Sequence, residues 1–313
     1  MKNEDLAERP LVSIVIPTFN RDALLREAVL SVVAQDYRPI EIVIVDNNSS
    51  DKSWSQILSL AREYPIIRAY RNRSNIGPVN NWKRAISLAN GSYCKILWSD
   101  DLISPDFLAA TVPLLDDHSV GLVFSAAAVF SDGRSISKTR YSLGRSGTIS
   151  TDLFLRGLMA GLPLFPVSPG CALFRTVDLR DSILEEYPFV WGGDALHHGV
   201  GPDLIIFLIV ASRYLRVAHV DRALASFRIH SESITISSRR VDTHYRYVSA
   251  RIYFAKNYRP EFGLILRLYL ALYRLRERPF SKVPKEIATS IREMGVSTSS
   301  FWQLFSFSLD MAR

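Results

Sequence analysis

The fold can be read from two stretches of the chain, LVSIVIPTFN at residues 11–20 and EIVIVDNNSSD at residues 41–51. Each stretch holds a short, mainly β-branched apolar run that changes abruptly to small polar residues and carboxylates. Runs of this kind are typical of strands whose two faces are both covered in a parallel sheet. The polar residues are therefore expected at the carboxyl ends of two buried strands.

The segments around these stretches alternate between strand and helix patterns. Further strand-like runs follow at residues 66–70, 93–98, 120–124 and 126–130. Helical spacing of apolar residues fills the intervals, at residues 22–35, from residue 51 onward, and at residues 78–89 and 105–115. Strands that alternate with helices predict βαβ units, and hence an α/β fold with a mostly parallel sheet flanked by helices.

The second half of the chain is less regular. Residues 135–200 are rich in Gly and Pro, so we expect loops and short helices there. A helix at residues 203–212 and a strand at residues 216–220 follow, and from about residue 239 the pattern is helical. We therefore expect an N-terminal tail (1–10), an α/β domain (11–237) with halves at 11–130 and 131–237, and a helical C-terminal appendage (238–313).

The composition excludes several classes of protein. With 313 residues and 48% hydrophobic content, the chain can bury a large core and is too apolar to be disordered. Its two cysteines, Cys94 and Cys171, cannot build a disulfide framework or a cysteine-based metal site, which suggests a reducing compartment. The net charge of +7 is compatible with an anionic partner but does not identify one.

Targeting segments and common cofactor motifs are not visible in the sequence. Residues 1–10 are charged and lack the apolar segment of a secretory signal, and no stretch approaches the roughly 20 apolar residues of a spanning helix. We therefore expect a cytoplasmic protein. No G-x-G-x-x-G, G-x-x-x-x-G-K-[ST] or G-x-S-x-G occurs, which argues against a dinucleotide enzyme, a P-loop NTPase and a nucleophile elbow.

Polar clusters follow three of the expected strands, at the edge where open α/β sheets bind ligands. Their members are Pro17, Thr18 and Asn20 after the first strand, Asp46 and Asn47 after the second, and Asp100 and Asp101 after the fourth. Turn and helix-cap roles would also explain the first two clusters. Adjacent carboxylates repel each other, however, and a hard divalent cation with oxygen ligands is the usual compensation.

The order and spacing of these motifs resemble glycosyltransferase family 2, whose members are nucleotide-sugar-dependent enzymes with the GT-A fold. The resemblance continues through NIGPVNNWKRAISLANG at residues 75–91 and YCKILWSDD at residues 93–101. A looser match runs from Asp203 to FRIHSESIT at residues 227–235. The family resemblance as a whole implies that residues 11–130 bind the nucleotide sugar and that residues 131–237 bind the acceptor.

The resemblance implies a role for each matching residue. The set expected to bind the nucleotide sugar is Pro17, Thr18, Asn20, Asp46, Asn47, Asn75, Asp100 and Arg228. Asp101 would hold Mn²⁺ or Mg²⁺ on the diphosphate, with His230 as a further ligand. Asp203 matches the general base, and Asp194, in a nearby Gly-rich segment, is the second choice. Ser99 stands where many members carry an acid, so one Asp would make most of the metal contact.

We therefore predict an inverting transferase that moves a sugar from a nucleoside-diphosphate sugar to an acceptor hydroxyl, in bacterial surface polysaccharide or glycolipid synthesis. The acceptor would be a glycan or a lipid-linked glycan. A nucleotidyltransferase of related fold is disfavoured, because no Gly-rich loop with a basic residue follows the first strand. An inactive sugar-nucleotide-binding homologue is disfavoured by the intact carboxylates. Nucleic-acid binding would explain the charge but not the carboxylate clusters.

Basic residues are concentrated near the C-terminus. Residues 256–285 contain eight Lys or Arg against two Glu, interleaved with Leu, Ile, Phe and Tyr. One interpretation is a helix lying at the inner face of the cell membrane. The other is a terminal helix that packs its apolar side on the α/β domain. The sequence specifies neither the donor nucleotide, the sugar, the acceptor nor the oligomeric state.

Overall fold

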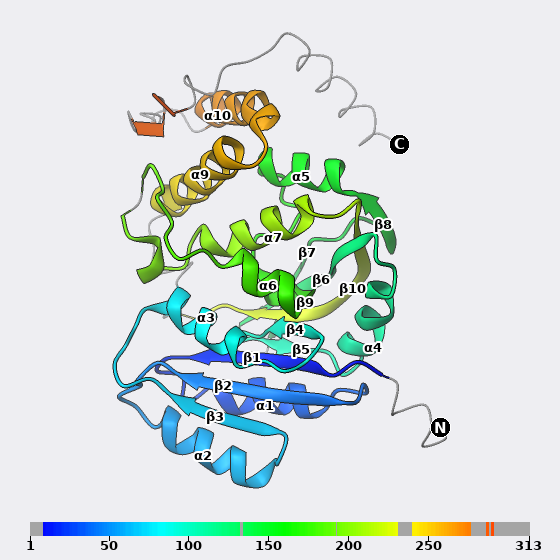
Figure 1. Ribbon diagram of the computed structural model, residues 1–313, viewed down its shortest axis with the longest axis vertical. Helices are drawn as coiled ribbons and strands as arrows, with labels where there is room; N and C mark the ends of the chain where they lie inside the picture. The colour runs from blue at the N-terminus through cyan, green and yellow to red at the C-terminus, as the bar shows by residue number, and fades with distance from the viewer. Residues whose placement is uncertain are drawn as a thin grey trace.

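The computed structural model describes residues 9–131, 134–191, 193–230, 240–276, 286–287 and 289–290. Three expectations fall largely outside these residues: the N-terminal tail, residues 231–235 of the last motif, and residues 277–285 of the basic segment. Figure 1 shows the described elements in order, from β3 and α2 at one end of the molecule, through the central sheet, to α9 and α10 at the other.

One mixed sheet of ten strands organises the described chain, with the order β3-β2-β1-β4-β9-β6-β10-β5 and with β7 and β8 at the side. The first four strands in this order are parallel to one another. They are β1 (Val12–Thr18), β2 (Ile40–Asp46), β3 (Ile67–Arg71) and β4 (Tyr93–Ile96). The register aligns Thr18 with Asp46 and Asp46 with Arg71, so the carboxyl ends of three strands meet at one edge.

The first strands are covered on both faces, as their apolar runs predict. Ile14 and Ile16 of β1 belong to one hydrophobic cluster, whereas Val15 belongs to another, because successive side chains of a strand point to opposite faces. Helices α1 (Leu25–Val33) and α2 (Ser53–Glu63) pack on the first face. The other face carries α3 (Pro78–Ser87), α5 (Thr151–Met159), α6 (Thr176–Ser182) and α7 (Pro202–Ser212).

The second half contains more strand than its sequence predicts. Residues 120–130 form one strand, β6 (Val120–Ser131), rather than two, and β10 (Arg216–Arg228) continues well past residue 220. Within residues 135–200, three strands accompany the expected loops and helices: β7 (Arg134–Arg140), β8 (Gly147–Ser150) and β9 (Ala172–Arg175). These strands are short or polar and are stabilised by pairing with β6 and β10, which local periodicity does not record.

Short elements lead away from the end of β4. They are β5 (Leu102–Ile103), α4 (Phe107–Thr111) and the 3₁₀ turn Val112–Leu115, where a single helix over residues 105–115 is expected. Strand β5 pairs antiparallel with Ala225 and Ser226 of β10. This pairing draws the end of β10 towards the residues that follow β4.

The chain is helical beyond residue 239 where it is described, as expected. It forms α9 (Arg240–Asn257), the 3₁₀ turn Pro260–Phe262 and α10 (Gly263–Arg276). Helix α9 packs on α7, and the apolar side chains Ile265, Leu266 and Leu270 of α10 are buried in the same hydrophobic cluster as α7. This favours the interpretation in which the basic segment packs its apolar side on the domain. Among the described residues, no helix is long and apolar enough to cross a membrane.

Candidate functional site

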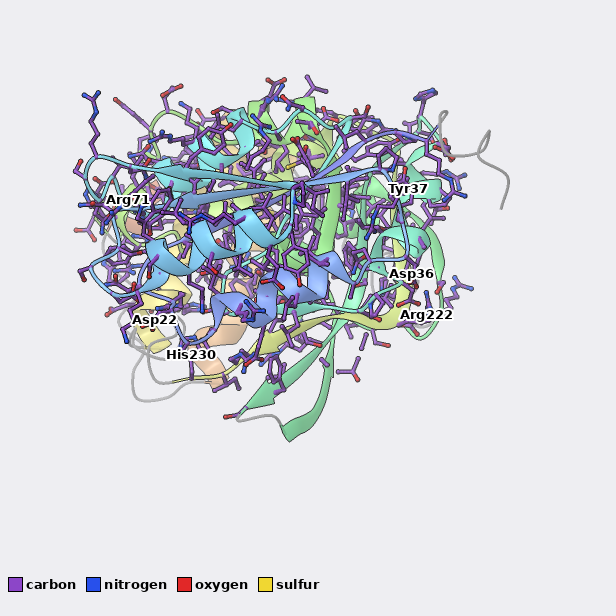
Figure 2. All side chains as sticks on the ribbon, turned by 90° about the horizontal axis from the view of Figure 1, so that it is seen from below. Asp22, Asp36, Tyr37, Arg71, Arg222 and His230 are labelled. Atoms are coloured by element: carbon purple, nitrogen blue, oxygen red, sulfur yellow. The ribbon has the colours of Figure 1, made fainter. Side chains whose placement is uncertain are left out.

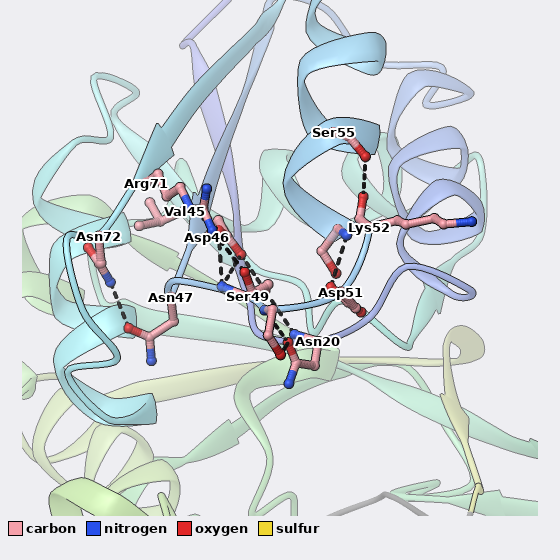
Figure 3. Close-up of polar contacts among 12 residues, drawn as sticks. Asn20, Val45, Asp46, Asn47, Ser49, Asp51, Lys52, Ser55, Arg71 and Asn72 are labelled. Carbon is pink, nitrogen blue, oxygen red and sulfur yellow. Dashed lines mark hydrogen bonds and ion pairs between the residues drawn. The ribbon is translucent and has the colours of Figure 1, made fainter.

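The carboxyl edge of the parallel strands holds Asp46 in a tight polar cluster (Figure 3). Asp46 is fully buried; it accepts hydrogen bonds from the backbone N–H and the hydroxyl of Ser49, and it pairs with Arg71 at 3.0 Å. The Asn20 N–H donates to the Ser49 hydroxyl at 2.9 Å, and the Asn20 side chain accepts from the Ser50 N–H. The structure therefore joins two sequence-predicted residues, Asn20 and Asp46, through Ser49.

Asparagine side chains cross-link the loops beside this cluster. The Asn47 amide donates to the Asn75 side-chain oxygen at 2.8 Å and accepts from Asn72 at 2.8 Å and from the Ile76 N–H at 3.0 Å. The backbone N–H of Asn47 donates to the carbonyl of Thr18, next to Pro17. The structure thus brings the sequence-predicted residues Asn47 and Asn75 into contact. Asn72 was missed, although it follows β3 and could have been found by the edge rule that singled out the others.

A second polar group, centred on Asp100, forms where β4 and β10 end. His230 Nε2 lies 2.9 Å from an oxygen of Asp100, and Arg21 Nε lies 3.4 Å from the same oxygen. The Arg228 N–H donates to Asp101 at 2.8 Å, and the Arg228 guanidinium donates to the Asp100 carbonyl at 2.9 Å. All four sequence-predicted residues of this group are brought together, across more than 120 residues of chain.

Arg21 connects the two groups and was not predicted. Its backbone N–H donates to the Ser53 hydroxyl at 2.8 Å, which fixes the loop after β1 against the start of α2. Its side chain reaches the Asp100 carboxylate. Figure 2 shows Arg71 and His230 at the same end of the molecule, opposite Tyr37. The sequence signal for Arg21 was its position directly after Asn20, in the loop that follows β1.

Asp101 is the candidate ligand for a divalent cation. Asp101 is buried, and burial together with the adjacent Asp100 carboxylate raises its pKa well above the ordinary value. A bound cation would offset the repulsion between the two adjacent carboxylates. Carboxylate oxygen together with imidazole nitrogen is a donor set that Mn²⁺ accepts. Within the described residues, no group of three or more His, Cys, Asp or Glu side chains is arranged to hold a metal. His230 lies within hydrogen-bond distance of the neighbouring carboxylate, that of Asp100.

Lys95 lies fully buried in β4, beneath this group, and was not predicted as a site residue from the sequence. Its ammonium group donates to the carbonyls of Ile96 and Gly170 and lies 4.8 Å from the centroid of the Phe107 ring. Burial lowers the pKa of Lys95 to about 8, and the charge of Asp101 opposes that shift. A lysine in the middle of an apolar run, YCKILW, was the available signal, because a buried charge is costly unless it is paired or hydrogen-bonded.

Asp203 occupies a different environment, at the start of helix α7, which is buried except at its last residue. One of its oxygens accepts the N–H groups of Gly201 (2.8 Å) and Leu204 (2.9 Å), and the other accepts the hydroxyl of Tyr247 in α9 at 2.7 Å. Gly201 has a φ of +104°, a conformation that L side chains rarely adopt. Burial raises the pKa of Asp203 to about 7, although these hydrogen bonds oppose the shift.

Asp194, the second candidate base, is a local cap. It accepts the Leu196 N–H at 2.9 Å and lies 2.7 Å from His197 Nδ1, both within its own 3₁₀ turn, Ala195–His197. The side chain is half exposed, and the Leu196 N–H, followed by His197, lowers its pKa. A carboxylate with a lowered pKa is a weaker base than Asp203, whose pKa lies near neutrality.

An aromatic pair connects the residues that precede Asp100 with the segment that precedes Asp203. The rings of Trp82 and Trp98 are 4.8 Å apart, and the Trp98 indole N–H donates to the Ser168 hydroxyl at 2.9 Å. Trp98 precedes Asp100 by two residues. Trp82 lies against Gly199, where an added Cβ would come within 2.6 Å of the ring. The pair therefore spans the space from the β4 end to the segment that leads into Asp203.

The chain is similar to one family over more than half of its length. The family model described as Glycosyl transferase family 2 matches residues 13–182. Abequosyltransferase RfbV of Salmonella typhimurium is 39% identical over 112 residues, which cover 35% of this chain and 34% of that protein. The GalNAc(5)-diNAcBac-PP-undecaprenol beta-1,3-glucosyltransferase of Campylobacter jejuni is 34% identical over 93 residues, 29% of this chain and 30% of that protein. The chain thus matches about a third of the length of these relatives.

Solved structures are similar over most of the chain. TarS 1–349 of S. aureus, in complex with UDP-GlcNAc, matches with a TM-score of 0.65 at 20% identity. The matched region covers 90% of this chain and 79% of the TarS chain. The mannosyltransferase PcManGT of Pyrobaculum calidifontis, in complex with GDP-Man and Mn²⁺, has a TM-score of 0.55 at 17% identity, with coverages of 97% and 86%. This likeness confirms the α/β GT-A fold that the sequence predicts.

Proposed function

Since this chain belongs to glycosyltransferase family 2, we propose that it moves a sugar from a nucleoside-diphosphate sugar to an acceptor hydroxyl with inversion at the sugar carbon. The observation that carries the proposal is the meeting of Asp100 and Asp101 with Arg228 and His230, while Asp203 is held apart from them. The reaction needs this division, because one group of residues must hold the diphosphate and another must take the acceptor proton.

The donor would bind along the carboxyl edge of β1, β2 and β4. Asn47 and Asn75 bond to each other and so fix the loops that would shape the pocket. Asn20 and Asp46 are both held through Ser49, and Asp46 also pairs with Arg71. Rigid, hydrogen-bonded side chains at this edge suit recognition of a base and a ribose. UDP-GlcNAc and GDP-Man in the two solved structures are nucleotide sugars of the proposed donor class.

Asp101 would hold a divalent cation on the diphosphate, with Asp100 beside it and His230 as a further ligand. Mn²⁺ or Mg²⁺ at that position would neutralise charge that develops on the leaving diphosphate. Mn²⁺ is present in the complex of the mannosyltransferase PcManGT. Arg228 lies beside the pair: its backbone N–H donates to Asp101 and its guanidinium donates to the Asp100 carbonyl. The same guanidinium also pairs with Glu27 at 2.6 Å.

Asp203 would be the general base. A carboxylate with a pKa of about 7 is ionised in a large fraction of molecules at neutral pH and accepts a proton readily. As the acceptor oxygen attacks the sugar carbon, its proton would pass to Asp203, and the bond from that carbon to the diphosphate oxygen would break. Tyr247 and the N–H groups of Gly201 and Leu204 orient the carboxylate throughout.

The acceptor would be a growing or lipid-linked bacterial surface glycan. The Salmonella relative is an abequosyltransferase, and the Campylobacter relative is a glucosyltransferase of a PP-undecaprenol glycan, which supports this class. A lipid-linked acceptor would bring the enzyme to the inner face of the cell membrane.

Co-sedimentation with anionic vesicles tests this membrane contact. We expect the wild-type chain to sediment with the vesicles and the triple Gln variant of Lys256, Arg259 and Arg267 to stay in solution. Equal sedimentation of both proteins would refute the membrane contact.

A thermal-shift screen tests the donor proposal. A ligand that binds only the folded state stabilises it by RT ln(1 + [L]/Kd), so a nucleotide at 100 times its Kd contributes about 2.7 kcal/mol. We expect one of UDP, dTDP, GDP and CDP, with Mn²⁺, to raise the melting temperature, and the Asp101→Ala variant to lose that response. No shift with any nucleotide, in the presence of Mn²⁺ or Mg²⁺, would refute nucleotide-sugar binding.

A further inference from the structure

A cavity of about 110 Å³ lies between the end of α5 with the segment that follows it, the end of β7, and the middle of α9. Its described lining is largely apolar, with two arginines and one tyrosine among the polar groups. The lining residues are Arg140, Tyr141, Leu158, Gly161, Leu162, Pro163, Phe165, Val167 and Arg251. None of them is acidic. A cavity of this size has room for several water molecules, and hence for a phosphate group, next to its three polar side chains.

Arg251 brings a buried positive charge to this cavity. The side chain is only 4% exposed; its Nε donates to the Leu158 carbonyl at 2.7 Å, and its guanidinium lies 5.1 Å from the centroid of the Tyr269 ring. Over the described part of the chain, no carboxylate forms an ion pair with Arg251. Because burying an uncompensated charge is costly, an anion that enters the cavity gains a strong electrostatic interaction.

Arg140 adds a second arginine to the lining of the cavity. It is the last residue of β7, it is exposed, and it belongs to a different element from Arg251. One arginine is enough to bind a carboxylate through two parallel hydrogen bonds. Two guanidinium groups from separate elements better match a phosphate group, which has more oxygens and a higher charge.

The cavity lies beside the proposed base. Tyr247 and Arg251 are four residues apart in α9 and so share one face of the helix. Tyr247 donates to Asp203 at 2.7 Å, and Arg251 lines the cavity. Tyr141 also lines it; burial raises the pKa of Tyr141, and the charge of Asp203 adds to the shift, because the two side chains are close enough to interact.

We propose that this cavity binds a phosphate group carried by the acceptor, through Arg251 and Arg140, and so holds the acceptor hydroxyl near Asp203. The inference rests on the proposed function, because it takes Asp203 as the mark of the acceptor side. It assigns helix α9 a direct part in acceptor binding. It also gives the acceptor a chemical class: a glycan joined to phosphate or diphosphate near the residue that is extended.

Calorimetric titration of the full chain with methyl phosphate, in EDTA and without donor, tests this site. EDTA suppresses metal-dependent binding of phosphate at Asp101. We expect saturable binding that is weakened roughly tenfold or more in Arg251→Gln and several-fold in Arg140→Gln, since each variant removes charge-assisted hydrogen bonds. Arg62→Gln, an exposed arginine of α2, is the matched control and should bind as the wild type does.

Each alternative result has a defined meaning. Absence of methyl phosphate binding overturns the proposal, and so does equal binding by wild type and Arg140→Gln. Because Arg140 is exposed, the Arg140→Gln comparison remains valid even if Arg251→Gln fails to fold. Acetate binding as tight as methyl phosphate overturns the phosphate class. Inorganic phosphate binding much tighter than methyl phosphate indicates a site for free phosphate and overturns the acceptor role. The proposed function is tested separately, by whether Asp203→Asn still transfers sugar. The titration with methyl phosphate contains no donor, so its outcome does not depend on that result.

Discussion

Replacing Asp203 by Asn separates the catalytic value of this carboxylate from its cost to stability. Asn retains an oxygen that can accept the N–H groups of Gly201 and Leu204, and its amide can donate to the Tyr247 oxygen. The substitution therefore removes the buried charge with little change in shape. We expect the variant to bind the donor normally, to lose transfer, and to be more stable than the wild type at high pH.

The size of the stability gain follows from the pKa of Asp203. Burial raises it from 3.8 to about 7, a shift of about three units, and one unit corresponds to about 1.4 kcal/mol. The folded state holds its proton between these two values while the unfolded state releases it, so wild-type stability falls as the pH rises through this window. The full cost at pH 8 is roughly 4 kcal/mol, and roughly 3 kcal/mol of it develops between pH 5 and pH 8.

Urea unfolding of wild type and Asp203→Asn at pH 5 and pH 8 measures this effect. The unfolding free energy of the variant minus that of the wild type should grow by roughly 3 kcal/mol between the two pH values. Asp194→Asn is the matched control, because Asp194 is half exposed and makes only local contacts; it should keep transfer activity. A difference that is the same at both pH values, or an active Asp203→Asn variant, would refute the reasoning.

Three further changes test other parts of the site. Tyr247→Phe removes a hydrogen bond that favours the charged form of Asp203, so the pKa of Asp203 should rise. The midpoint of the rate–pH profile should therefore rise by roughly one pH unit. An unchanged midpoint contradicts the orienting role. Asp101→Ala should abolish Mn²⁺-dependent nucleotide binding in calorimetry, and an unchanged affinity refutes the metal role. Burial lowers the pKa of Lys95 to about 8, so its ammonium form costs stability below that pH. The wild type should therefore gain roughly 2 kcal/mol relative to Lys95→Met between pH 7 and pH 10 in urea unfolding, and a constant difference argues against a charged Lys95.

The parallel half of the fold and its polar edge were predictable because their signals are local. A buried strand must be apolar along its whole length, and the chain must turn where the apolar run ends, so Asp46 and Asp100 could be assigned to an edge by position alone. Strands β7, β8 and β9 were not predicted. Their stability comes from pairing with β6 and β10, and their own sequences are too short or too polar to indicate it.

Several partners in the site were invisible for a related reason. Tyr247 and Arg251 lie in a helical segment that appeared peripheral, and only the packing of α9 on α7 brings them to Asp203 and the cavity. Arg21 and Asn72 could have been found by the edge rule, but their contacts with Asp100 and Asn47 depend on how two loops fold against each other.

The sequence by itself determined the α/β class, the order of the first strands, the family and the candidate carboxylates. Each of these follows from residue type and spacing over a few residues, where apolar periodicity and chain turns are encoded. Only the tertiary structure decided the environment of each carboxylate. Asp203 is buried against Tyr247 and has a raised pKa, whereas Asp194 is half exposed and has a lowered pKa. That difference arises from desolvation and hydrogen bonding, which depend on which distant elements pack around each side chain.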